Sequence, residues 1–145
     1  MLTDRLIIVN QQKPIPLPES FLDDTTVQSS GVEVFIEPKS AKEILEFLRN
    51  SKYLRKFRQI LSVVLQGKYN KDLYGKEDLS GTAEDVTAMK FKGKPNTRIY
   101  CKEFFLEDGK KVVMVEFLGN KDKQKATSPK VKSKIEATGR RHYEF

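Results

Sequence analysis

The stretch TRIYCKEFFLEDGKKVVMVEFL, residues 97–118, decides the fold. Two segments rich in β-branched and aromatic residues flank Glu107-Asp108-Gly109-Lys110, and an Asp-Gly pair suits the positive backbone angles of a tight reversal. These residues predict a hairpin of two strands, 97–106 and 111–118. Residues 86–91 read as another strand, so the second half of the chain is expected to form an antiparallel meander.

Upstream of this meander, the chain reads as a strand followed by a helix. Residues 32–37 carry apolar side chains at 32, 34 and 36 with acids at 33 and 37, which is the pattern of a half-buried strand. Pro38 is expected to end it. Ser40 and Glu43 match a capping box, in which two side chains satisfy amides at a helix start. A first helix is therefore predicted directly after this strand.

Two further helices are predicted on either side of the meander. Apolar residues at spacings of three and four over 54–65 indicate a second amphipathic helix, which ends near Gly67. Residues 68–85 are polar and read as a surface loop. Near the C-terminus, Ser128-Pro129 is a helix cap with proline at the first helical position. The order of these elements predicts an α+β fold in which an antiparallel sheet packs against a two-helix hairpin.

The N-terminal residues 1–31 read differently and are interpreted as an extension of a domain spanning 32–145. Residues 13–18 alternate proline with other residues, which favours an extended arm over a helix. This arm and the rest of residues 1–50 are net acidic. We therefore consider two roles for the arm: it folds over a basic face, or it adds an edge strand through Leu6 to Val9.

Composition excludes several classes of protein. The apolar runs at 6–9 and 112–115 are too short to cross a bilayer, and Arg5 with four apolar residues is too small for a secretory signal. No membrane association is expected, and the expected location is the cytoplasm. One cysteine, Cys101, and one histidine, His142, exclude an internal disulfide framework and a Cys/His zinc site.

Basic charge is concentrated in the last two thirds of the chain. The net charge is −3 over residues 1–50, +6 over 51–100 and +4 over 101–145, which gives +7 in total. Such a surface suits a polyanion, because each neutralised phosphate releases condensed counterions. Lysines that serve only solubility remain the alternative.

The order of elements from residue 32 onward resembles the RelE/HigB superfamily of bacterial toxins, the RNA-cleaving halves of toxin–antitoxin pairs. The resemblance rests on four segments in the same order: the opening strand with Pro38 to Lys42, the strand start Thr97 to Tyr100, the apolar strand Lys111 to Leu118, and Leu118 to Pro129 with its lysines and helix start. It implies a toxin that cleaves mRNA without a metal or cofactor, on the ribosome, inhibits translation, and is silenced by a small antitoxin protein.

Metal-free RNA cleavage needs a proton acceptor for the ribose 2′-OH, positive donors for the charged phosphorane, and an acid for the leaving 5′ oxygen. Arg98 is the first candidate, because the resemblance places a phosphate-binding arginine there and a guanidinium grips two phosphate oxygens. The resemblance also implies catalytic roles for His142 and Tyr143, since some members end in a basic segment with His and Tyr. A solvated, structural arginine and an idle terminal histidine are the competing interpretations.

Clustered basic residues complete the predicted RNA-binding surface. Lysines alternate along two segments, so that their side chains point the same way wherever the backbone is extended. The predicted RNA-binding residues are Lys90, Lys92, Lys94, Lys121, Lys123, Lys125, Arg140 and Arg141. Cys101, in mid-strand, is expected to be a small buried residue rather than a nucleophile.

Two other functions compete with the ribonuclease. One is a non-catalytic RNA- or protein-binding module on a toxin-like fold, because fold does not fix function. The other is a structural protein of a phage or mobile element.

Overall fold

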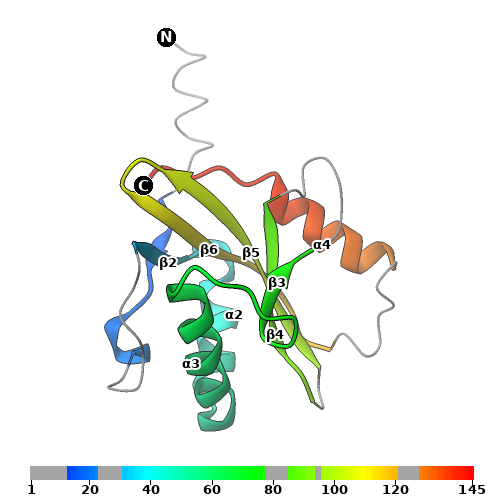
Figure 1. Cartoon of the computed structure of the whole chain (residues 1–145). Helices are drawn as coiled ribbons and strands as arrows, with labels where there is room; N and C mark the ends of the chain where they lie inside the picture. The colour runs from blue at the N-terminus through cyan, green and yellow to red at the C-terminus, as the bar shows by residue number, and fades with distance from the viewer. Residues whose placement is uncertain (1–12, 23–30, 78–84, 94–95, 121–127) are drawn as a thin grey trace.

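The computed structural model describes residues 13–22, 31–77, 85–93, 96–120 and 128–145. Over these residues it is an α+β protein with a six-stranded sheet and three α-helices (Figure 1). The predicted class is therefore confirmed. The elements in chain order are β1 (Ile15–Pro16), the short 3-10 helix η1 (Glu19–Phe21), β2 (Val32–Ile36), α2 (Pro38–Leu48), α3 (Ser51–Leu65), β3 (Tyr74–Lys76), β4 (Val86–Phe91), β5 (Thr97–Leu106), β6 (Gly109–Leu118) and α4 (Pro129–Gly139).

The sheet is mixed, with the strand order β1-β2-β6-β5-β4-β3. β4, β5 and β6 form the predicted antiparallel meander. β2 pairs with β6 in parallel, with Val34 opposite Val112. The prediction of a wholly antiparallel sheet is therefore wrong for this pair. The meander returns its last strand beside β2 in the same direction, and only tertiary pairing sets that direction.

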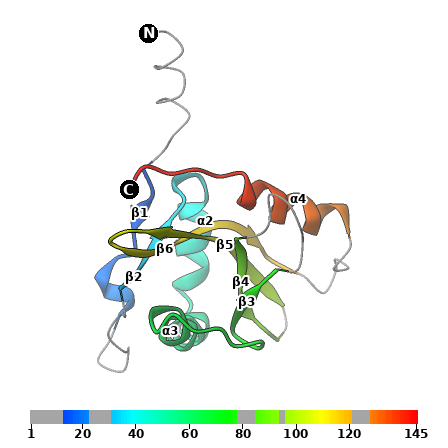
Figure 2. The same ribbon diagram turned by 45° about the horizontal axis from the view of Figure 1, so that its top comes forward.

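Helices cover both faces of the sheet. α2 and α3 form the predicted hairpin and bury Ile44, Leu48, Phe57 and Ile60 in one apolar cluster with the sheet. α4 packs on the opposite face through Val131 and Ile135 in a second cluster. Figure 2 shows α3 and α4 on opposite sides of the strands. The sheet therefore separates two surfaces, and the fold has one more packed helix than a two-helix hairpin.

Helix starts follow local capping chemistry. α2 begins at Pro38 and is capped by Glu37, whose carboxylate accepts a hydrogen bond of 2.8 Å from the Lys39 amide. The Ser40 hydroxyl instead donates to the Val115 carbonyl at 2.5 Å, so the predicted capping box is wrong and the helix starts three residues earlier. Ser128 caps α4 as predicted.

The described part of the N-terminal arm lies at the β2 edge of the sheet. Ile15 is opposite Ile36, and the Leu17 amide donates to the Val34 carbonyl at 3.0 Å. Phe21 packs edge-on against Phe57 of α3. The arm thus supplies an edge strand, but with residues other than 6–9, which lie outside the described residues.

β3 was not expected, since it falls in the segment read as a polar loop. It carries Tyr74, which is fully buried on the face of the sheet that α2 and α3 cover. Tyr74 belongs to a cluster of polar side chains. The carboxylate of Glu103, also buried, accepts hydrogen bonds from Tyr74 at 2.7 Å and Tyr69 at 2.8 Å. Lys110 forms an ion pair with the same carboxylate at 2.7 Å. This cluster, Tyr69, Tyr74, Glu103 and Lys110, ties β3 to the β5–β6 hairpin.

Cys101 is fully buried beside this cluster, as the sequence predicts. Burial raises the pKa of its thiol above the usual range, and the Glu103 carboxylate raises it further. A thiol that stays protonated is a poor nucleophile.

No helix in the described part of the chain combines the length and apolar character needed to cross a bilayer.

Candidate nucleic-acid interface at the end of the sheet

Arg98 and Lys90 lie directly opposite each other on β5 and β4. Opposed residues of an antiparallel pair project from the same face of the sheet. Burial lowers the pKa of Lys90, the Glu77 carboxylate opposes this effect, and the positive charge of Arg98 lowers it further. The structure therefore brings together Arg98, the first catalytic candidate, and Lys90, one of the predicted RNA-binding lysines, on the face that carries α4.

The Arg98 side chain is held in place at the start of β5. The residue is 8% exposed, and its Nη1 atom donates to the Asn96 side-chain oxygen and, at 3.1 Å, to the Thr97 carbonyl. These contacts fix the guanidinium beside the end of the strand. A fixed cation is suited to binding an anion without a further loss of side-chain entropy.

Tyr100 and Asn120 add polar atoms that sequence analysis did not assign to the site. Tyr100 packs against α4, and burial together with Glu77 raises the pKa of its hydroxyl to about 12, with Arg98 opposing the shift. Within the described residues, the buried Tyr100 hydroxyl and the Asn120 Oδ1 atom lack hydrogen-bond partners. Asn120 follows two residues after Leu118, which is opposite Arg98, and the charge of Arg98 acts on the Tyr100 hydroxyl, so both polar atoms belong to the surroundings of Arg98.

The other predicted lysines are placed only in part. Lys90 Nζ donates to the Lys71 carbonyl at 2.7 Å, and Lys92 forms an ion pair with Asp72 at 2.7 Å. Both lysines thus contact the turn that precedes β3. Some of the predicted residues lie outside the described part of the chain: Lys94, Lys121, Lys123 and Lys125.

The last described residues of β6 nevertheless lead toward Arg98. Leu118 is opposite Arg98 in the sheet, and the Thr97 hydroxyl donates to the Gly119 carbonyl at 2.8 Å. The chain therefore leaves β6 next to Arg98 before it enters the segment that carries the three later lysines.

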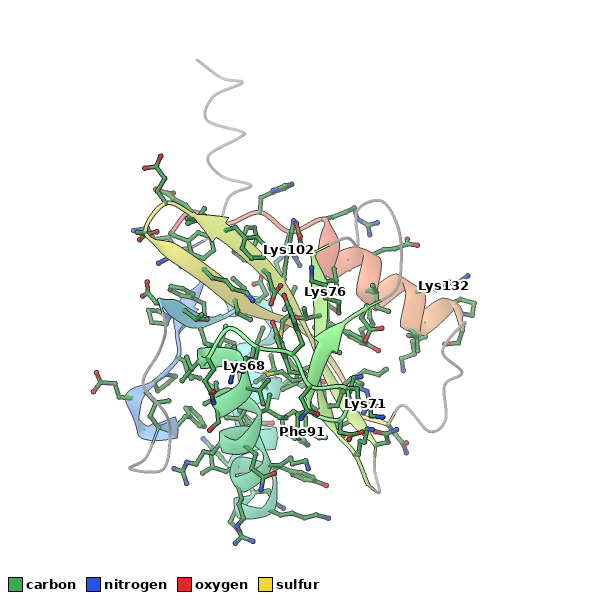
Figure 3. The ribbon with its side chains drawn as sticks, in the orientation of Figure 1. Lys68, Lys71, Lys76, Phe91, Lys102 and Lys132 are labelled. Atoms are coloured by element: carbon green, nitrogen blue, oxygen red, sulfur yellow. The ribbon has the colours of Figure 1, made fainter. Side chains whose placement is uncertain are left out.

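The C-terminal tail, residues 140–145, crosses the same face of the sheet from α4 toward β2 (Figure 2). Lys102 is buried and donates to the carbonyls of Gly139 at 2.8 Å and Arg141 at 2.7 Å. Lys102 is labelled in Figure 3, where it lies next to the tail. Phe145 packs against Phe35 and Phe104. The tail is extended over the strands instead of continuing the helix.

His142 and Tyr143 sit within this tail. The Tyr143 hydroxyl donates to the buried Glu37 carboxylate at 2.9 Å, while His142 is exposed. Burial, reinforced by Glu37, raises the pKa of Tyr143 well above its usual range. The Tyr143 ring contacts Phe104, and six residues of extended strand, about 20 Å, separate that position from Arg98. The structure therefore does not place Tyr143 beside Arg98 and Lys90.

The two tail arginines are close to acids. Arg140 lies 3.8 Å from Glu136, and Arg141 lies 3.8 Å from Glu37. Together with Ala137 they line a cavity of about 240 Å³ at the end of α4. The lining of this cavity includes neither Lys90 nor Arg98.

Among the described residues, no cluster of three or more His, Cys, Asp or Glu side chains is arranged to hold a metal ion. No protein-family model, curated protein or solved structure matches the chain.

Proposed function

We propose that this protein is an RNA-cleaving toxin of a toxin–antitoxin pair, and that it acts at the Arg98 centre, which comprises Glu77, Lys90, Arg98 and Tyr100. The observation that carries the proposal is the placement of Lys90 opposite Arg98, beside a buried hydroxyl and a carboxylate. The element order of strand, helical hairpin, three-stranded meander and helix also supports a RelE/HigB-like fold.

The groups at this centre suit the cleavage of RNA by its own 2′-hydroxyl. Arg98 and Lys90 would neutralise the phosphate on which charge develops. Glu77 would accept the 2′-hydroxyl proton as the 2′ oxygen bonds to phosphorus. As the bond to the 5′ oxygen breaks, Lys90 would protonate that oxygen. The products would be a 2′,3′-cyclic phosphate and a 5′-hydroxyl end, with no metal or cofactor.

The proposed partners follow from the charge and the resemblance. The substrate would be mRNA, and a ribosome would offer the dense phosphate surface that attracts a basic protein. A small antitoxin with an acidic or amphipathic segment would cover the active surface. The site of action would be the cytoplasm.

Primer-extension mapping of message ends after brief induction tests the proposal. We expect new 5′ ends with the wild type, and a loss of at least about 100-fold in cleavage for Arg98→Ala, the range for removal of one transition-state donor. Lys42→Ala, which removes an exposed lysine from α2, is the matched control and should cut normally. Unchanged message ends on induction of a folded wild-type protein would contradict the proposal.

A non-catalytic RNA-binding module is the second candidate. The burial of Arg98 and its bonds to Asn96 and Thr97 favour it, because a guanidinium held this way also serves to stabilise the strand end. Purified protein that binds RNA but leaves it intact, with ribosomes present and absent, would select this function.

A further inference from the structure

A basic pocket lies on the other side of the sheet, between the first half of α3 and the end of β4. It has a volume of about 240 Å³. Its cations come from three α3 residues and from the residue after β4, and its walls include two aromatic rings. We call it the α3 pocket; it is lined by Lys52, Tyr53, Arg55, Lys56, Gln59, Phe91 and Lys92.

Most of the positive charge of the α3 pocket is not neutralised by acids of the described residues. Lys52, Arg55 and Lys56 follow the spacing that places side chains on one helical face, where like charges repel one another. Over residues 13–22, 31–77, 85–93, 96–120 and 128–145, none of these three forms an ion pair. Lys92 is paired with the exposed Asp72. The pocket therefore presents a net positive charge that an anionic ligand would neutralise.

Aromatic packing makes one wall of the α3 pocket rigid. Tyr53 stacks on Phe47 with ring centroids 4.3 Å apart, and Phe47 meets Phe91 edge-on at 5.0 Å. Phe91 is 1% exposed and is labelled beside α3 in Figure 3. Lys52 Nζ lies 5.6 Å from the Tyr53 ring centroid, so the partly exposed ring already attracts a cation. An aromatic ring next to several cations is the combination that binds a base and its phosphate.

We propose that the α3 pocket binds one nucleotide unit of single-stranded RNA, with the phosphate on Arg55 and Lys56 and the base against Tyr53. The amide of Gln59 offers both a donor and an acceptor to the base edge. This inference rests on the proposed function, since it assigns a second binding site to the same substrate.

The position of the α3 pocket relative to the Arg98 centre supports the binding of one RNA strand to both sites. Lys90 belongs to the Arg98 centre and Lys92 to the pocket, and both contact the turn at Lys71 and Asp72. A strand that passes this edge of the sheet would reach both groups of cations, one on each face. The pocket would then hold the RNA beside the cut rather than at it.

Fluorescence anisotropy tests this assignment with a labelled 2′-O-methyl RNA of about 12 nucleotides, a length within the range that such grooves bind. The methyl group removes the 2′-hydroxyl, so cleavage cannot interfere. Each lost phosphate contact lowers the slope of log affinity against log salt by about 0.7 on a single strand. The double variant R55A/K56A removes both cations from the single phosphate of the pocket, so we expect it to lower the slope by about 0.7 and to weaken binding.

The charge-matched control is the double variant K39A/K42A, which removes two exposed lysines from α2. It should leave the slope nearly unchanged. Tyr53→Leu should weaken binding about tenfold at an unchanged slope, because stacking of one base contributes roughly 1–3 kcal/mol. Circular dichroism spectra and thermal melts establish that each variant is folded.

Two outcomes would overturn the inference while leaving the proposed function intact: equal losses in R55A/K56A and K39A/K42A, or no effect of Tyr53→Leu with equal affinity for duplex RNA. Either result would describe a diffuse polyanion surface without a nucleotide pocket. Loss of cleavage in Arg98→Ala would still support the ribonuclease. Wild-type protein that neither binds nor cuts RNA would instead refute the proposed function itself.

Discussion

Tyr74→Phe tests whether the buried polar cluster is a main source of stability. The Tyr74 side chain is fully buried, and its hydroxyl donates to Glu103 at 2.7 Å while accepting from the Thr87 hydroxyl at 2.9 Å. The substitution removes one oxygen and leaves the ring in place. The loss of stability should therefore report the hydrogen bonds and not a large cavity.

The expected loss is about 3 kcal/mol. A hydrogen bond to a charged group contributes roughly 1.5–3 kcal/mol, and loss of the acceptor for the buried Thr87 hydroxyl adds about 1 kcal/mol. Tyr69→Phe removes a hydroxyl that contacts the same carboxylate at 2.8 Å, but Tyr69 is 46% exposed. Water can replace that bond, so the expected cost is only about 0.5–1 kcal/mol.

Urea unfolding followed by circular dichroism measures both variants under one condition. Equal slopes of free energy against urea would show that the midpoints report stability alone. A double-mutant cycle with Glu103→Gln should give a coupling of at least about 1 kcal/mol for Tyr74, since the two groups share a hydrogen bond. A loss in Tyr74→Phe below about 0.5 kcal/mol, or no greater than in Tyr69→Phe, would refute this reasoning.

Three further predictions concern single positions, and a fourth concerns the buried tyrosines. Gly109→Ala should lower the free energy of unfolding by at least about 2 kcal/mol in the same urea assay. Gly109 has a φ of 132°, and a Cβ atom there would clash with the Gly31 carbonyl oxygen. Unchanged stability would contradict this prediction. Lys102→Met should cost about 2 kcal/mol and speed digestion of the tail by carboxypeptidase, because both carbonyl bonds at the end of α4 are lost; a tail digested at the wild-type rate would count against it. Ellman's reagent at about pH 8 should label Cys101 only after denaturation, because burial raises the pKa of the thiol; rapid labelling of the folded protein would show that the thiol is accessible. Folding raises the pKa of the buried Tyr100 hydroxyl to about 12, whereas a tyrosine of the unfolded chain ionises near pH 10. The free energy of unfolding should therefore fall as the pH rises above about 10. Melting temperatures that do not change up to about pH 11 would exclude this effect.

Local patterns were enough to predict most of the elements. The meander, the hairpin of helices and the Ser128 cap depend on periodicity and on neighbouring residues, which are visible in the sequence. β3 was missed because it has three residues, one of them Gly75, in a polar stretch. Its Tyr74 is buried by distant Glu103, and no local pattern reports that contact. The parallel pairing of β2 was missed for the same reason.

The site was predictable only in part. The sequence indicated Arg98 and Lys90 as separate candidates, and strand register places them opposite each other. It could not show that Tyr100 and Asn120 contribute buried polar atoms, since burial depends on α4 and the end of β6. The catalytic roles of His142 and Tyr143 were only implied by the family resemblance. The hydrogen bond of Tyr143 to Glu37, far away in the sequence, places the tail elsewhere on the sheet.

The parallel pairing of β2 with β6 has a consequence for biosynthesis. Lys111 and Glu33, which bond across this pair, are 78 positions apart, so the contact closes late and at a large entropic cost. During translation, β2 leaves the ribosome before β6 is synthesised. Until β6 is also released, the edge of β2 that pairs with β6 has no partner strand. The nascent chain can aggregate through this unpaired strand edge, and a chaperone that binds unpaired strands would protect it.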